Sequence, residues 1–153
     1  PGSNGGSAVM RYEYSINGGG TWTSTGSLST EFTIGGLTDG QPVSVRVRAV
    51  TAVGDGSPSA AVSGTPASAP TAPTLTSVVR GDRSLTVTAA PADNGGSPIT
   101  RWEYSTDGGA TWATAPGAGP SHVLIAPSAD LGARLQNGQG YSVQVRGVNV
   151  VGA

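Results

Sequence analysis

One stretch of this chain occurs twice. Residues 4–22 return as residues 94–112, with Arg, Glu-Tyr-Ser, Gly-Gly and Thr-Trp at matching positions. Residues 37–48 return as residues 135–146, so the offset grows from 90 to 98 and the second copy carries an eight-residue insertion between the two blocks. Self-similarity at a fixed period is typical of modules that stack along a chain. A length of 153 residues therefore divides into two small modules.

The local pattern of both copies predicts an all-β fold. Short segments alternate apolar and polar residues, and Gly, Asn, Asp and Pro separate them. That spacing is typical of a sandwich or barrel of antiparallel strands. We expect strands at residues 59–64, 74–79, 85–88, 99–106, 122–125 and 141–148, with turns at residues 80–83 and 107–108.

The two copies are cut out of register. Pro1 aligns with Pro91, so the first copy lacks counterparts of residues 74–88, and the second copy stops where a counterpart of residues 59–64 would begin. The prediction is a partial module at 1–66, a Pro-rich linker at 67–73 and a module lacking its last strand at 74–153. We expect the chain to be a window from a longer array, the alternative being strands donated by a neighbouring subunit.

Four motifs in order resemble tandem fibronectin type III modules of bacterial or bacteriophage type. They are the opening at residues 72–78, the loop at 91–100, the late block at 135–152 and the close at 54–66. The resemblance implies tandem immunoglobulin-like β-sandwiches, the first without its two N-terminal strands and the second without its last.

The resemblance also implies structural roles for several residues. Tyr141 would reach back to the backbone of the loop around Leu135 and Gly138, as the tyrosine corner of such sandwiches does. The first copy has Val43 in that place. Residues 89–90 are alanines where the family has a core tryptophan, so Trp102 or Trp112 is expected to fill that volume.

Two sets of residues are candidates for binding. The tripeptide Arg80-Gly81-Asp82 matches the integrin-binding motif of animal relatives, yet it falls on a different loop, and ordinary turn chemistry is the favoured interpretation. Trp22 and Trp112 each follow a Gly-rich hairpin and could stack on a sugar ring or anchor an interface. The favoured alternative is that each pairs across the strands with Tyr14 or Tyr104 and sets the hairpin register.

Charged residues alternate with these aromatics. Two expected neighbouring strands carry Arg and Glu on one face, which predicts a solvated cross-strand ladder worth about 0.2–1 kcal/mol per pair. Its members are Arg11, Glu13, Arg46, Arg48, Arg101 and Glu103.

Other chemistry finds little support in the sequence. The net charge of −1 gives no general attraction for nucleic acid or an anionic membrane, and no apolar run is long enough to span a bilayer. Asp93-Asn94 offers too few oxygens for calcium. His122, next to Ser121, is the only histidine and has no evident acid partner. We expect no enzyme, no cofactor and no metal.

The functional prediction is a non-catalytic spacer or display array outside the cell, on a cell surface or on a virion. Its partners would be other modules or subunits of the same assembly, or a surface polysaccharide. Two alternatives stay open. The array could belong to a secreted polysaccharide-degrading enzyme, or a module could be an adhesin that binds through its loops or tryptophans.

Overall fold

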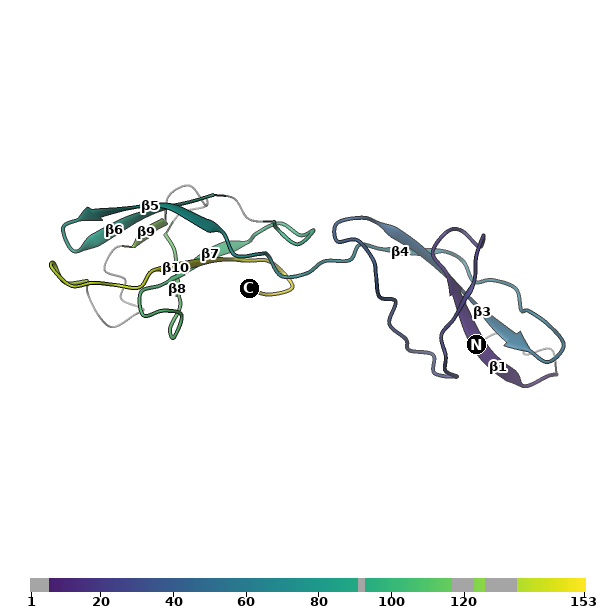
Figure 1. Ribbon diagram of the computed structural model, residues 1–153. Helices are drawn as coiled ribbons and strands as arrows, with labels where there is room; N and C mark the ends of the chain where they lie inside the picture. Colours follow the sequence, from purple (N-terminus) through teal and green to yellow (C-terminus); the bar gives the residue numbers. More distant parts are fainter. Residues whose placement is uncertain (1–5, 91–92, 117–122, 126–134) are drawn as a thin grey trace. The chain divides into compact units, whose positions relative to one another are not determined.

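The computed structural model describes residues 6–90, 93–116, 123–125 and 135–153, and these residues form strands and no helix. The prediction of an all-β chain is confirmed. Two compact units divide the chain at Pro66, with unit 1 running from Pro1 to Pro66 and unit 2 from Ala67 to Ala153 (Figure 1). No helix in the described part is long and apolar enough to cross a membrane.

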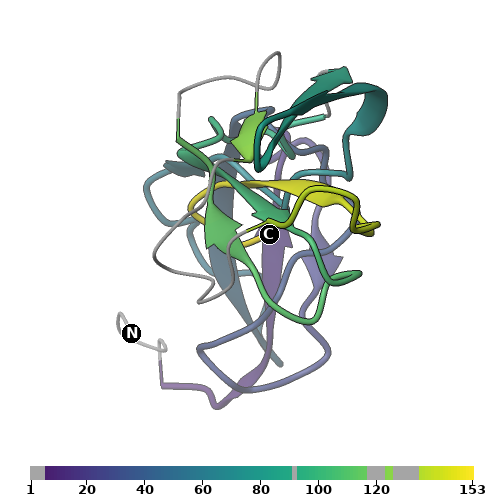
Figure 2. The ribbon, with the colours of Figure 1, turned by 90° about the vertical axis from the view of Figure 1, so that its left-hand side faces the viewer.

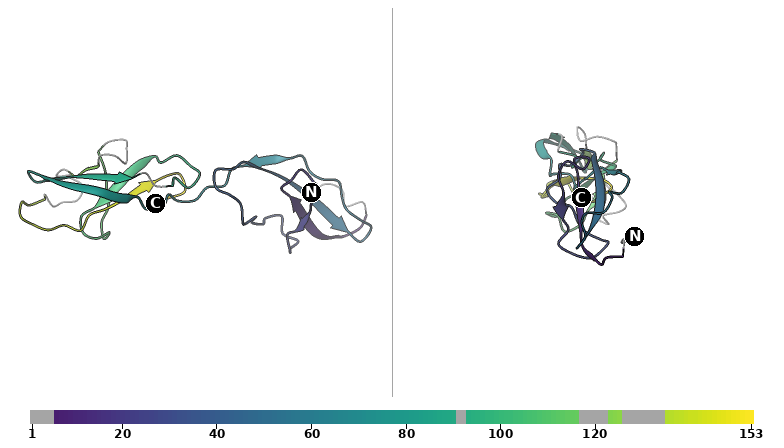
Figure 3. Two further views of the ribbon diagram at one scale, coloured as in Figure 1. Left: turned by 45° about the horizontal axis from the view of Figure 1, so that its top comes forward. Right: turned by 90° about the vertical axis from the view of Figure 1, so that its right-hand side faces the viewer.

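Unit 1 contains one four-stranded antiparallel sheet with the order β2-β1-β3-β4. Figure 3 shows β1 and β3 running beside each other. The strands are β1 (Val9–Ser15), β2 (Thr23–Ser24), β3 (Val43–Thr51) and β4 (Val62–Gly64). The last strand is shorter than the expected 59–64. Ser59 still bonds to β3, since its N–H donates to the Val47 carbonyl at 2.8 Å.

Unit 2 contains two three-stranded sheets with the orders β10-β7-β8 and β5-β6-β9. The strands are β5 (Thr74–Gly81), β6 (Ser84–Ala90), β7 (Arg101–Ser105), β8 (Ala113–Thr114), β9 (Val123–Ile125) and β10 (Gln144–Val148). The sheets form two layers, as in a β-sandwich (Figure 2). Val87 of β6 meets Trp102 and Tyr104 of β7 and Val145 of β10 in the core.

Several predicted boundaries need correction. The strand expected at 141–148 begins only at Gln144, because Tyr141 lies in the preceding loop and its hydroxyl accepts the Gln136 N–H at 2.8 Å. The turn expected at 80–83 is narrower. Arg80 and Gly81 continue β5, and the chain reverses at residues 82–83, where Arg83 adopts a φ of 49°. The strand expected at 99–106 is confined to β7.

The aromatic residues of unit 2 differ in how deeply they are buried. Trp102 is 5% exposed and packs in the core with Val87. Trp112 is only partly buried and does not belong to that cluster. Tyr104 is 1% exposed at the centre of the core, and Leu135 is buried with it.

The segment between the units is bonded at both ends. Pro66 accepts a hydrogen bond from Gly40 N–H of unit 1 at 2.9 Å. In unit 2, Ser68 N–H donates to the Gly95 carbonyl at 2.9 Å, and the Ser68 carbonyl accepts from the Asn149 side chain at 2.7 Å. The Pro-rich stretch at 67–73 is therefore attached to unit 2 from its second residue onward.

Candidate functional site

A cluster of two arginines, one glutamate and one tryptophan occurs on the sheet of each unit, and we call it the Arg–Glu–Arg cluster. In unit 1 its members are Arg11, Glu13, Arg48 and Trp22; in unit 2 they are Arg101, Glu103, Arg146 and Trp112. Strand pairing brings them together, because Glu13 lies opposite Arg48 and Glu103 lies opposite Arg146. The other arginine stands two residues earlier on the same strand and so on the same face.

The glutamate of each cluster bridges its two arginines. Glu13 Oε1 is 2.8 Å from Arg11 Nη2, and Glu13 Oε2 is 2.7 Å from Arg48 Nη2. In unit 2, the corresponding distances from Glu103 are 2.8 Å to Arg101 Nε and 2.8 Å to Arg146 Nη2. Each carboxylate thus uses both oxygens in charge-assisted hydrogen bonds, which are stronger than neutral ones.

The ladder was expected to be solvated, and for the glutamates this is wrong. Glu13 is 7% exposed and Glu103 is 8% exposed. The hydrogen bonds from Arg48 and Arg11 hold the pKa of Glu13 below its usual value. Burial alone would raise the pKa of Glu103, but the bonds from Arg101 and Arg146 outweigh it and lower that pKa. Both groups are therefore ionised at neutral pH and are already fully bonded.

Within the described part of the chain, the ring of each cluster tryptophan lies against an arginine. The Arg48 guanidinium carbon is 4.4 Å from the ring centroid of Trp22, and that of Arg146 is 4.0 Å from the ring centroid of Trp112. A cation–π contact of this kind contributes about 0.5–1 kcal/mol at an exposed site. The aromatic ring pair found among the described residues is instead Tyr14 with Phe32. One face of each indole is thus covered by its own cluster and is closed to a stacked sugar.

The hairpin before each tryptophan is held by a repeated set of hydrogen bonds. In unit 2, the Ser105 hydroxyl donates to Asp107 Oδ1 at 2.7 Å and accepts from Gly109 N–H at 2.8 Å. Bonds from Thr111 and then Ser105 hold the pKa of Asp107 well below its usual value. In unit 1, Ser15 and Asn17 make the corresponding bonds. These polar groups set the hairpin, and they leave no free general acid or base there.

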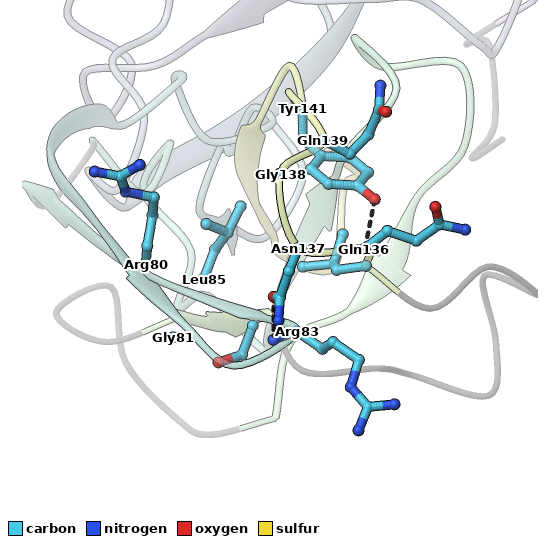
Figure 4. A pocket seen from close by; sticks show the side chains of 11 residues that line it. Arg80, Gly81, Arg83, Leu85, Gln136, Asn137, Gly138, Gln139 and Tyr141 are labelled. Carbon is cyan, nitrogen blue, oxygen red and sulfur yellow. Dashed lines mark hydrogen bonds between the residues drawn. The ribbon is translucent and has the colours of Figure 1, made fainter.

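Arg80 and Gly81 of the tripeptide border a hollow of about 320 Å³ in unit 2, including space open to solvent (Figure 4). Asn137, from the opposite loop, clamps the turn. Its side-chain nitrogen donates to Asp82 Oδ1 at 2.9 Å, and its oxygen accepts the Arg83 N–H at 3.0 Å. The Asp82 side chain is 78% exposed but is bonded to the opposite loop, which favours the turn interpretation.

Arg80 lines the same hollow but makes no ion pair within the described residues. Arg83 points away from it in Figure 4 and faces Asp82 at 3.9 Å. The Tyr141 hydroxyl already accepts the Gln136 N–H, a contact of the kind that the resemblance implies, and Gly138 borders the hollow with a φ of 85°. The hollow therefore offers a single unpaired guanidinium, which does not make a site for a multiply charged ligand.

The described metal candidates, Asp93 and Asn94, are engaged in a loop. Asp93 Oδ1 accepts the Gly95 N–H at 2.8 Å and Asn94 Oδ1 accepts the Gly96 N–H at 2.9 Å, so both side chains cap the tight loop. Among the described residues no three acidic, histidine or cysteine side chains could hold a metal ion. Ser121 and His122 lie outside the described residues.

The feature that sequence reasoning missed is the burial of the glutamates. A signal was present in the motif Arg-x-Glu on one strand and an Arg on the strand opposite, repeated at both offsets. No family model matches this chain, and comparison with curated proteins finds none with significant similarity.

Proposed function

We propose that the chain is part of a non-catalytic array of fibronectin type III-like modules that spaces or displays other domains outside the cell, on a cell surface or on a virion. Its side chains hold shape and set the distance between modules. Other modules or subunits of the same assembly are the expected partners, and no cofactor is involved.

The observation that carries this proposal is the short joint between the units. Pro66 is bonded to unit 1 and Ser68 to unit 2, so Ala67 is the one residue between two anchored positions. Proline also restricts φ, which further reduces the freedom of the joint. A spacer needs such a connection, because a flexible tether of many residues would not transmit a defined distance.

The chemistry of the side chains gives further support. The groups that could have formed a ligand site in both units are already engaged. The glutamate and one face of the indole in each Arg–Glu–Arg cluster contact the arginines of that cluster. Functional sites usually keep polar groups available for a ligand. The repetition of this arrangement favours a structural part for it in each module.

The proposal is tested by the distance between the two units. The chain has no cysteine, so Val53→Cys together with Val150→Cys gives two specific attachment points for spin labels at exposed positions. We expect electron–electron dipolar spectroscopy to give one narrow distance distribution. The matched control inserts about eight Gly/Ser residues after Ala67, which should behave as a flexible coil and broaden the distribution.

A broad distribution in the parent chain, as wide as that of the insertion variant, would contradict a spacer. The other functional alternatives have their own readout. Saturable binding of a surface polysaccharide by the intact chain, lost in Trp112→Ala with the fold unchanged, would instead favour an adhesin.

A further inference from the structure

Asparagine is followed by glycine at three places in the described part of the chain, residues 17–18, 94–95 and 137–138. A fourth pair, Asn4-Gly5, lies outside the described residues. Such a pair can lose ammonia without an enzyme, because glycine has no side chain to hinder attack of its amide nitrogen on the asparagine side chain. The attack needs a free glycine nitrogen and a peptide bond plane that can rotate. The surroundings of each pair therefore decide which asparagine reacts.

The pair Asn94-Gly95 is held by hydrogen bonds and close packing. The Gly95 N–H donates to Asp93 Oδ1 at 2.8 Å, so the attacking nitrogen is engaged. The Gly95 carbonyl accepts the Ser68 N–H at 2.9 Å, and the backbone of Ser68 lies so close that a methyl group on Gly95 would clash with it. The peptide cannot rotate without displacing Ser68, so Asn94 is protected.

The pair Asn17-Gly18 lies in the hairpin between β1 and β2. Asn17 Oδ1 accepts the Ser15 hydroxyl at 2.8 Å and the Thr21 N–H at 2.9 Å, and Asn17 Nδ2 donates to the Thr21 hydroxyl at 2.9 Å. The hairpin itself is closed by the pairing of Tyr14 with Thr23. The Asn17 side chain must leave three hydrogen bonds before it can react, so it is also protected.

The pair Asn137-Gly138 is the most open of the three. Gly138 has a φ of 85°, its N–H makes no hydrogen bond among the described residues, and a methyl group there would have nothing within 4 Å. The exposed Asn137 side chain is held by two bonds, from its Nδ2 to Asp82 Oδ1 and from the Arg83 N–H to its Oδ1 (Figure 4). Because the Asp82 side chain is 78% exposed, water can replace that contact readily.

The corresponding turn of unit 1 carries an acid in place of this amide. Asp39-Gly40 matches Asn137-Gly138 at the offset of 98, and the two glycines have φ angles of 74° and 85°. The bond that closes the turn, from the N–H of the fourth residue to the carbonyl of the first, is 3.2 Å long in both. The backbone turn forms with either side chain, so the amide of Asn137 serves the contact with the turn at residues 82–83.

We propose that Asn137 is a site of spontaneous deamidation and that the reaction releases Asp82 from the loop at residues 136–139. The Gly138 nitrogen forms a bond to Asn137 Cγ, the bond from Cγ to Nδ2 breaks, and ammonia leaves with the proton of the glycine N–H. Water then opens the five-membered imide at either carbonyl carbon and gives aspartate or isoaspartate. The proposal does not rest on the spacer function, since it concerns a covalent change within unit 2.

The product cannot keep the contact with Asp82. An aspartate at this position has no N–H to donate. One of its oxygens can still accept the Arg83 N–H, but the other would face the Asp82 carboxylate, and two like charges in contact repel each other even in water. Isoaspartate also adds a carbon to the backbone of the turn. No step restores the amide, so the loop changes once and does not return.

The test is a time course of the full chain in mildly alkaline buffer made with ¹⁸O-water. Trypsin cleaves after arginine and places each Asn-Gly pair in its own peptide, at residues 1–11, 12–46, 84–101 and 135–146. Mass spectrometry then follows conversion of each amide to an acid that carries the label. We expect Asn137 to convert at least about fivefold faster than Asn94, since each protecting hydrogen bond slows opening several-fold.

Two matched variants test the cause. Asp82→Ala removes the acceptor of Asn137 Nδ2 and should speed conversion at Asn137 alone. Asp93→Ala frees the Gly95 nitrogen and should speed conversion at Asn94 alone. Asn137→Gln keeps an amide but would need a slower six-membered ring, so its peptide should stay unchanged. In Asn137→Asp, the NMR contacts between residues 82 and 137 should be lost while those of Val87 with Trp102 persist.

The site assignment fails if Asn94 or Asn17 converts as fast as Asn137, or if Asp82→Ala leaves the rate at Asn137 unchanged. Contacts between residues 82 and 137 that persist in the converted chain would overturn the release of Asp82. The time course of the parent chain compares the sites without any substitution, so it decides the assignment even if a variant fails to fold.

Discussion

The buried carboxylate of unit 2 allows a quantitative test of how the sheet is held together. Glu103 is 8% exposed, and the guanidinium groups of Arg101 and Arg146 bind its two oxygens at 2.8–2.9 Å. The change Glu103→Gln keeps the size of the side chain but replaces one acceptor oxygen by an NH₂ donor. That donor must face a guanidinium group, so a favourable contact becomes a repulsive one.

The magnitude follows from the bonds and their exposure. A hydrogen bond to a charged group contributes about 1.5–3 kcal/mol when shielded from water. Here the side chains of Arg101 and Arg146 are 51% and 37% exposed, so water can solvate them again and the loss is reduced. We expect Glu103→Gln to lower the free energy of unfolding by roughly 1–2.5 kcal/mol.

The assay is urea unfolding of the full chain, followed by residue-resolved NMR so that the two units are read separately. Glu31→Gln is the matched control, because Glu31 is exposed and makes no ion pair within the described residues. A surface change of that kind should stay within about 0.5 kcal/mol. Unit 1 should unfold at the same urea concentration in the parent and in Glu103→Gln.

The pH dependence gives a second, independent reading. The folded pKa of Glu103 lies below its ordinary value of 4.5, so the ionised form stabilises the fold. That contribution is fully present above about pH 4.5 and is lost as the pH falls through the folded pKa. The difference between parent and variant should therefore shrink in acid. A cost no larger than that of Glu31→Gln, or a difference that stays constant in acid, would refute the reasoning.

Two further changes probe the loop of unit 2 and the joint between the units. Tyr141→Phe removes one hydrogen bond and should cost about 0.5–1.5 kcal/mol in urea unfolding, whereas Tyr12→Phe, whose hydroxyl makes no hydrogen bond within the described residues, should cost less. Gly95→Ala places a methyl group against the Ser68 carbonyl at a φ of 65°, so it should break the anchor and broaden the spin-label distance distribution. Gly138→Ala has a similar φ but open space around it, so it should destabilise unit 2 by about 1–2 kcal/mol and leave the distance distribution narrow.

The strands could be predicted from the sequence because alternation and turn residues were clear, but several boundaries could not, and the start of β10 shows why. Tyr141, Val143 and Val145 continue a perfect period of two. Both Tyr141 and Val143 pack against the core of unit 2 whether or not their backbone pairs with β7. The ladder begins at Gln144 because Ser142 instead forms a parallel bridge with Asp107. Side-chain periodicity carries no information about that choice.

The pairing of charges could also be predicted, but their burial could not. Alternation places Glu13 on an outward face, and an outward face predicts a solvated side chain. Arg11 and Arg48 then cover that face with their long side chains, and Trp22 lies against Arg48. Long amphipathic side chains can shield a neighbour from water while their own charge stays partly wet. Composition and spacing do not reveal such cover before the strands are placed.

The two copies also differ in one cross-strand pair, and this difference explains how Trp102 fits into the core of unit 2. Tyr12 lies opposite Ala49 in unit 1, and Trp102 lies opposite Gly147 in unit 2. A methyl group on Gly147 would come within 3.4 Å of the Trp102 ring and within 3.0 Å of Ile99. The larger ring is thus matched by a smaller partner, which keeps the interior close-packed.

The opposite face of the same strands, which carries the Arg–Glu–Arg cluster, does not differ in this way between the units. Its two arginines, its glutamate and its tryptophan occupy corresponding positions in both. Their charges and rings bond to one another and leave few groups for a ligand on that face. We therefore expect this face to hold the sheet of each unit together and not to bind a ligand.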